Sequence, residues 1–230
     1  NKDKLLPLKK DIRTLAVIGP NADNVYNMLG DYTAPQADGT VVTVLDGIRQ
    51  KVSKETRVLY AKGCAVRDSS RTGFKDAIET ARNADAVVMV MGGSSARDFS
   101  SEYEETGAAK VTINQISDME SGEGYDRATL HLMGRQLELL EEISRLGKPV
   151  VLVLIKGRPL LMEGAIQEAE AIVDAWYPGM QGGNAVADVL FGDYNPAGRL
   201  TLSVPRSVGQ LPVYYNTRRK GNRSRYIEEP

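Results

Sequence analysis

Hydrophobic residues in this chain gather into short, nearly continuous runs that are rich in β-branched side chains. Four of the five main runs are nearly continuous in apolar character, which is typical of strands that are covered on both faces. The five runs occupy 14-TLAVIG-19, 57-RVLYA-61, 85-DAVVMVMGG-93, 149-PVVLVLI-155 and 171-AIVDAWY-177. A further run, 199-RLTLSVP-205, could form a last strand in an antiparallel orientation.

Segments with the spacing of amphipathic helices separate these runs. They cover residues 43–52, 73–84, 129–146, 163–169 and 182–192. Strands that alternate with helices predict a largely parallel sheet with right-handed crossovers. We therefore expect an α/β fold: a three-layer sandwich, with a mostly parallel sheet of about six strands and helices on both faces. The expected domain covers residues 1–215, and residues 216–230 are expected to be a loop or tail.

Composition narrows the possible functions. The 230 residues suffice for one buried domain, and the formal net charge of -1 favours neither nucleic acid nor an anionic membrane as a partner. The single cysteine, Cys64, excludes an internal disulfide and a cysteine-based zinc site. We expect it to be a small apolar residue near a strand end. We predict no metal site and no cofactor.

One connection in the chain is abnormally long. About thirty-five residues separate Gly93 from the helical pattern at Thr129, whereas most such loops have about 2–6 residues. The connection leaves the carboxyl end of the third predicted strand, the edge at which open parallel sheets bind ligands. Between residues 98 and 126 it holds a single lysine, Lys110, and a series of carboxylates: Asp98, Glu102, Glu104, Glu105, Asp118, Glu120, Glu123 and Asp126. This acidic loop is the best functional candidate in the chain.

Several common site types fit the sequence poorly. The turn at 19–30 lacks the three-glycine spacing of a dinucleotide fingerprint, and 92-GGSSA-96 lacks the last glycine of a hydrolase nucleophile elbow. The only histidine, His131, lies within the expected helix at 129–146, which disfavours a Ser-His-Asp site. The run 118-DMESGEG-124 departs from calcium-loop spacing. A nucleotide-binding α/β domain remains an alternative because the architecture allows it.

Glu123 lies between Gly122 and Gly124 in the acidic loop. Glycines permit backbone angles that other residues avoid, and they remove side-chain bulk. A glutamate between them can project toward a ligand that approaches the main chain. General acid catalysis on an acetal oxygen needs such a carboxyl group. On pattern alone, an ordinary charge on a solvated turn remains the competing interpretation.

The sequences of several segments resemble the second domain of glycoside hydrolase family 3. This resemblance is carried by the string SGEGYDR at 121–127 and by 147-GKPVVLVLIKGRPLLM-162. It extends through 15-LAVIGPNAD-23, 28-MLGDYTAP-35 and the long run 175-AWYPGMQGGNAVADVLFGDYNPAGRLTLSVPRS-207. The resemblance thus covers nearly the whole chain.

This resemblance implies a domain of a retaining, exo-acting β-glycosidase of the β-glucosidase or β-xylosidase type. Glu123 falls on the family's general acid/base, with Glu120 as the nearest competitor. The family's nucleophile is an aspartate on a preceding (β/α)8-type barrel. A barrel takes about 250 residues, so we expect this chain to be an excised segment that is inactive alone. The implied partners are a β-linked oligosaccharide or an aryl or alkyl glycoside, and the barrel of the same parent protein. The implied parent is periplasmic or secreted.

Residues near Glu123 receive supporting roles. Arg97 and Asp98 follow the third strand and are candidates for substrate binding, with a surface ion pair as their competing role. Tyr125 is a further candidate, with packing of the loop as its competing role. Loop support is expected from Gly122, Gly124, Asp126 and Arg127, with Asp126 near the start of the following helix. A non-catalytic carbohydrate-binding or interaction module is the remaining alternative.

Overall fold

The computed structural model describes residues 1–96, 105–106 and 118–214. Its described part contains a sheet of five parallel strands in the order β2-β1-β3-β4-β5. The strands are β1 (Thr14–Ile18), β2 (Arg57–Ala61), β3 (Ala86–Gly92), β4 (Val150–Ile155) and β5 (Ala171–Asp174). The expected tail at 216–230 and the substrate-binding candidates Arg97 and Asp98 lie outside the described residues.

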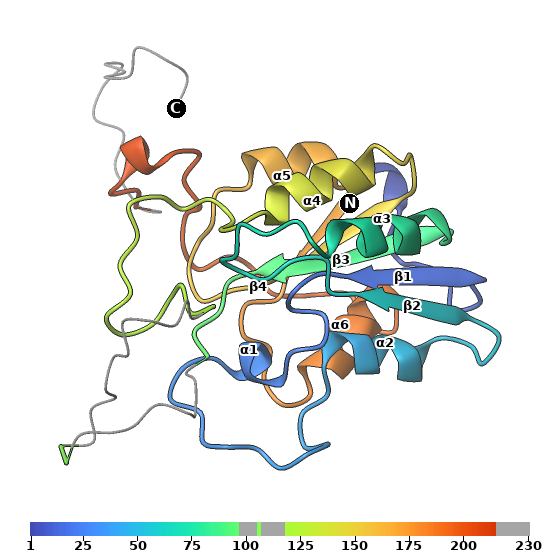
Figure 1. The fold of residues 1–230 in the computed structure, drawn as a ribbon, viewed down its shortest axis with the longest axis horizontal. Helices are drawn as coiled ribbons and strands as arrows, with labels where there is room; N and C mark the ends of the chain where they lie inside the picture. Colours follow the sequence, from blue (N-terminus) through green and yellow to red (C-terminus); the bar gives the residue numbers. More distant parts are fainter. Residues whose placement is uncertain (97–104, 107–117, 215–230) are drawn as a thin grey trace.

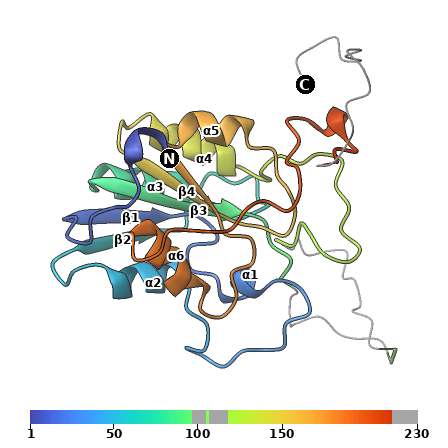
Figure 2. The same cartoon turned by 180° about the vertical axis from the view of Figure 1, so that it is seen from behind.

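Helices cover both faces of the sheet, which confirms the predicted α/β sandwich. The helices are α1 (Val25–Leu29), α2 (Val44–Lys51), α3 (Phe74–Arg82), α4 (Gln136–Ser144), α5 (Glu163–Glu168) and α6 (Gly182–Leu190). Figure 1 shows α3, α4 and α5 on one face and α2 and α6 on the other, and Figure 2 shows the same layers from behind. Short 3-10 helices at Lys2–Lys4 and Val208–Gln210 lie near the two ends of the described chain.

Alternate residues of each strand feed two separate cores. In β1, Leu15 and Val17 pack in the core beneath α2 and α6, whereas Ala16 and Ile18 pack in the core beneath α3 and α4. All the residues of β3 and β4 are buried. This double coverage explains why the strand sequences are continuously apolar.

No helix among the described residues is long and apolar enough to cross a lipid bilayer.

The strand order reverses direction between β1 and β3. From β1 the chain moves outward to β2 on one side, and then returns to β3 on the other. Ligands of open parallel sheets bind outside the carboxyl ends of the strands at such a switch point. Gly19 ends β1 here with φ +132°, and a β-carbon on it would lie 2.1 Å from the carbonyl oxygen of Val90. The two strand ends therefore approach each other closely.

Two sequence expectations about strands need correction. The run at 199–205 is not a strand, because its alternate apolar residues find too little cover; Leu200 is 56% exposed. The sheet thus has five strands in the described part, close to the six expected. The strand expected at 171–177 ends at Asp174, since Trp176 adopts a positive φ of 55°, which an extended strand does not allow.

The helix expected at 129–146 begins only at Gln136. Gly134 has φ +62°, and a β-carbon there would lie 2.7 Å from the carbonyl oxygen of Asp68, so the chain bends tightly before the helix. Asp126 consequently lies well before the helix rather than at its start, and His131 lies on a loop. The buried Gln136 side chain binds both backbone groups of Gly92, accepting from N–H and donating to C=O at 2.8 Å each.

Candidate active site

The end of the acidic loop lies beside the start of the same loop. The carbonyl of Ser94, just after β3, accepts hydrogen bonds from the backbone N–H groups of Glu120 at 2.8 Å and Ser121 at 3.2 Å. These contacts place the segment from residue 118 onward over the carboxyl end of β3. The acidic loop therefore returns to the edge of the sheet that the sequence predicted as functional.

A buried amide network supports this edge from below. The Ser94 hydroxyl donates to Asn27 Oδ1 at 2.6 Å, and Asn27 Nδ2 donates to Asn21 Oδ1 at 2.7 Å. Asn21 Nδ2 in turn donates to the carbonyl of Gly93 at 3.0 Å. Chains of satisfied buried hydrogen bonds select one rigid arrangement. The backbone that holds the loop is thus fixed to the ends of β1 and β3.

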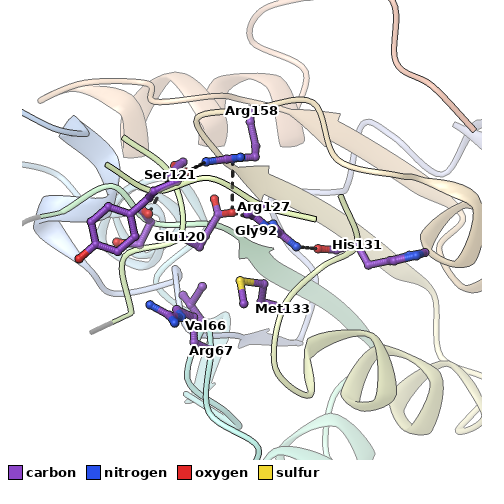
Figure 3. Close-up of polar contacts among 12 residues, drawn as sticks. Val66, Arg67, Gly92, Glu120, Ser121, Arg127, His131, Met133 and Arg158 are labelled. Carbon is purple, nitrogen blue, oxygen red and sulfur yellow. Dashed lines mark hydrogen bonds and ion pairs between the residues drawn. The ribbon is translucent and has the colours of Figure 1, made fainter. Parts of the chain in front are cut away.

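Glu120 is a buried anchor of the loop. Its side chain is 1% exposed, and its Oε2 atom lies 2.6 Å from Arg127 Nη1 and 3.6 Å from Arg158 Nε. Figure 3 shows the carboxylate between the two arginines. Gly93 makes room for it, because a β-carbon on Gly93 would lie 1.9 Å from Glu120 Oε1. The arginines therefore engage Oε2 of this carboxylate, which is closed to solvent.

The same two arginines also hold the backbone of the loop. Arg158 Nη2 donates to the carbonyl of Tyr125 at 2.7 Å, and Arg127 Nη2 donates to the carbonyl of His131 at 2.5 Å. Arg158 follows β4, so it connects the loop to a fully buried strand. We name Glu120, Arg127 and Arg158 the arginine clamp.

Glu123 differs from Glu120 in its surroundings. It is exposed, and its Oε2 atom accepts a hydrogen bond from the hydroxyl of Tyr32. The flanking Gly122 and Gly124 have φ +116° and +80°, values that favour glycine. The N–H of Tyr125 closes a turn onto the carbonyl of Gly122 at 3.2 Å. The structure therefore presents Glu123 at the tip of a turn whose base is anchored.

Tyr177 supports the turn from the side of β5. Its hydroxyl lies 2.9 Å from Ser121 Oγ, next to the anchored part of the loop. Burial raises the pKa of the Tyr177 phenol, and the hydrogen bond with Ser121 opposes this shift. The phenol is therefore neutral at physiological pH and acts as a hydrogen-bonding group rather than as a charge.

The site contains residues to which the sequence analysis gave no role. The position of Arg158 could have suggested a role in the site, because the residue follows the fourth predicted strand at the same edge as the acidic loop. The position of Tyr32 in the sequence does not suggest a contact with Glu123, because only the fold brings the two residues together. Of the predicted neighbours, Tyr125 is half-buried and Asp126 is exposed. Within the described residues, no group of three or more His, Cys, Asp or Glu side chains could hold a metal ion.

Comparison with known proteins places this geometry in context. The family model of the glycosyl hydrolase family 3 C-terminal domain matches residues 1–229. A β-xylosidase of Formosa agariphila is 43% identical over 94% of this chain, and a periplasmic β-glucosidase of Salmonella typhimurium is 37% identical over 100%. The solved structure of a β-glucosidase from Erythrobacter marinus is similar over the whole chain, with a TM-score of 0.80 and 34% identity.

These relatives are much longer than the present chain. The chain spans 27% of the Formosa protein, 31% of the Salmonella protein and 31% of the Erythrobacter structure. The similarity therefore concerns one part of each relative.

Proposed function

The chain belongs to the glycosyl hydrolase family 3 C-terminal domain family, and on this premise we propose that it carries the general acid/base of a retaining, exo-acting β-glycosidase. The proposed acid/base is Glu123. The proposed nucleophile is an aspartate on a barrel domain of the same parent protein. The isolated chain is then inactive, because it holds one of the two carboxyl groups that the reaction needs.

The contrast between Glu120 and Glu123 supports this assignment. An acid/base must reach the glycosidic oxygen and exchange protons with water, so it cannot be sealed inside the protein. Glu120 is 3% exposed and its carboxylate is held by Arg127 and Arg158, whereas Glu123 is exposed between two glycines. The observation that carries the proposal is this exposed carboxylate on an anchored turn at the sheet edge where ligands bind.

The proposed reaction has two steps. First, the barrel aspartate bonds to the anomeric carbon while the bond to the leaving oxygen breaks, and the Glu123 carboxyl gives its proton to that oxygen. Second, the Glu123 carboxylate takes a proton from a water molecule, whose oxygen bonds to the anomeric carbon and releases the aspartate. Retaining enzymes place the two carboxyl groups about 5–5.5 Å apart. The parent would therefore bring its barrel close to the turn at 122–124.

The names of the relatives support a substrate class. They comprise β-xylosidases and β-glucosidases, so we propose terminal β-xylosides or β-glucosides as substrates, in oligosaccharides or in aryl or alkyl glycosides. The name of the Salmonella relative supports a periplasmic location for the parent protein.

The test compares full-length parent enzyme with its Glu123→Ala variant on aryl β-xylosides and β-glucosides. Loss of the acid should lower kcat/KM for poor leaving groups such as phenol by roughly 10²–10⁴-fold. Substrates with 2,4-dinitrophenol, which leaves without protonation, should lose much less in the first step. For these 2,4-dinitrophenyl substrates, azide should restore turnover of Glu123→Ala, because it replaces the water that Glu123 would activate in the second step. A β-glycosyl azide should accumulate.

The matched control is Glu141→Ala, which removes a carboxylate from the surface of α4. It should behave like the unaltered enzyme. If Glu123→Ala loses activity equally on all substrates, or loses none, the acid/base role of Glu123 is overturned. No loss, together with sugar binding by the isolated chain, would favour a non-catalytic carbohydrate-binding module.

A further inference from the structure

We propose that Arg158 is a positioning residue for the acid/base turn, acting through Glu120 and the Tyr125 carbonyl. This inference rests on the proposed role of Glu123. The relevant feature is that one guanidinium group contacts both sides of the turn. Its Nε lies 3.6 Å from Glu120 Oε2, and its Nη2 donates to the Tyr125 carbonyl at 2.7 Å.

The contacts of Arg158 bracket Glu123 in the chain. Before the turn, the N–H groups of Glu120 and Ser121 are bound to the Ser94 carbonyl. After the turn, the Tyr125 carbonyl is bound to Arg158. Three residues, 122–124, remain between the two attachments, and two of them are glycines with positive φ. Glycine allows the turn many conformations, so external attachments must select the one that aims Glu123.

Arg158 links this turn to the rigid part of the molecule. It lies three residues beyond Ile155, the last residue of β4, in which every residue is buried. Arg127, the other cation of the clamp, belongs to the same loop as Glu123. It therefore cannot attach that loop to another part of the fold. Figure 3 shows Arg158 above Glu120, and Arg127 and His131 to the right of it.

Stability alone explains the clamp poorly. Burying an ion pair costs desolvation that its attraction often fails to repay, and apolar residues of similar size commonly stabilise a fold as well or better. The cost is evident here, because Glu120 Oε1 and Arg158 Nε are buried and have no hydrogen-bond partner among the described residues. The arrangement makes better sense as a device that fixes one geometry at the site.

The experiment uses full-length parent enzyme carrying Arg158→Met, Glu123→Ala or both changes. Misplacing the acid should impair its proton transfer selectively. We expect Arg158→Met to lower kcat/KM for phenyl glycosides by about 10–100-fold, and for 2,4-dinitrophenyl glycosides by less than about 3-fold. If Arg158 acts through Glu123, adding Arg158→Met to Glu123→Ala should cause no further loss on phenyl glycosides.

Equal losses on both leaving groups, or losses that multiply in the double variant, would overturn the positioning role while leaving Glu123 as the acid/base. If Glu123→Ala itself shows no leaving-group dependence, the proposed function fails, and this inference fails with it. Arg145→Met, which removes an exposed arginine near the end of α4, is the control and should change nothing. Should Arg158→Met fail to fold, Arg158→Lys can be used, because lysine keeps the positive charge but lacks the planar guanidinium group with its several N–H donors. We expect the same selective decrease in kcat/KM, but a smaller one.

Discussion

The guanidinium group of Arg127 lies 2.6 Å from the carboxylate of Glu120, and their side chains are 7% and 1% exposed. This pair fastens the segment before the Glu123 turn to the segment after it. Glu120 is the carboxylate that competes with Glu123 in the sequence. Its burial gives the two glutamates different tasks: one holds the loop, and the other faces solvent.

Removing Glu120 should destabilise the domain strongly. Glu120→Ala leaves Arg127 and Arg158 facing each other without a counter-charge, and breaking a buried pair in this way costs about 3 kcal/mol. Urea unfolding of the chain measures the loss. The surface variant Glu138→Ala, which removes exposed ion pairs of α4, should cost less than about 1 kcal/mol. Similar losses in the two variants would contradict the anchoring role.

Adding one methyl group at Gly93 should disturb the clamp. The new β-carbon would lie 1.9 Å from Glu120 Oε1, so the carboxylate or the backbone must move. We expect Gly93→Ala to lower the free energy of unfolding by about 1–3 kcal/mol. Gly198→Ala is the matched control, because its β-carbon would meet no atom within 4 Å. Equal unfolding midpoints for both variants would show that the space at Gly93 is unimportant.

Cys64 should be unreactive in the folded chain. Burial raises the pKa of its thiol to about 12, and the side chain lies within the core beneath α3 and α4. At pH 8 the thiolate is then on the order of 10⁻⁴ of the total. Ellman's reagent should leave the native chain unmodified and should label one thiol after unfolding in urea. Rapid stoichiometric labelling of the native chain would contradict this prediction.

Acid should weaken the ion pairs that join Asp193 to Lys10 and Lys51. The hydrogen bonds from Lys10 and Lys51 hold the pKa of Asp193 below its usual 3.8. A lowered folded-state pKa means that the stabilisation is present above pH 3.8 and disappears as pH falls through the lower value. Melting temperatures from pH 7 to pH 2 should show Asp193→Asn below the parent sequence above pH 3.8, and the two curves should converge as the pH falls through the lowered pKa of Asp193. The exposed control Asp38→Asn should follow the parent sequence throughout.

The single tryptophan should report on a buried lysine. Lys156 Nζ lies 3.8 Å from the centre of the Trp176 ring and 2.9 Å from Asp174 Oδ2. Lys156→Met removes the charge next to the indole, so the emission maximum of Trp176 should shift. Arg82→Met removes an exposed cation of α3 and should leave the emission unchanged. An unaltered spectrum in Lys156→Met would contradict the contact.

Much of the fold was accessible from local patterns. Continuous apolar runs marked the inner strands β1, β3 and β4 because these strands are buried along their whole length, and shorter apolar runs marked the edge strands β2 and β5. The 3.6-residue spacing marked α2, α3, α5 and α6. The start of α4 was missed because Gly134 bends the chain through a contact with Asp68, which lies far away in the sequence. The run at 199–205 was misjudged because composition does not show whether a strand finds a partner.

The sequence by itself determined the layered architecture, the edge of the sheet that carries the site, and the short list of Glu120 and Glu123 as candidate carboxylates. The architecture and the edge follow from periodicity and from the order of elements, which are local. The choice of Glu123, with Glu120 as its competitor, rests on the glycines around Glu123 and on the resemblance of the SGEGYDR string to the family. Only the tertiary structure decided that Glu120 is buried between Arg127 and Arg158 while Glu123 is exposed beside Tyr32. Burial and partners depend on residues that follow α1, β3 and β4 and meet the loop only when the chain folds, so no local pattern contains them.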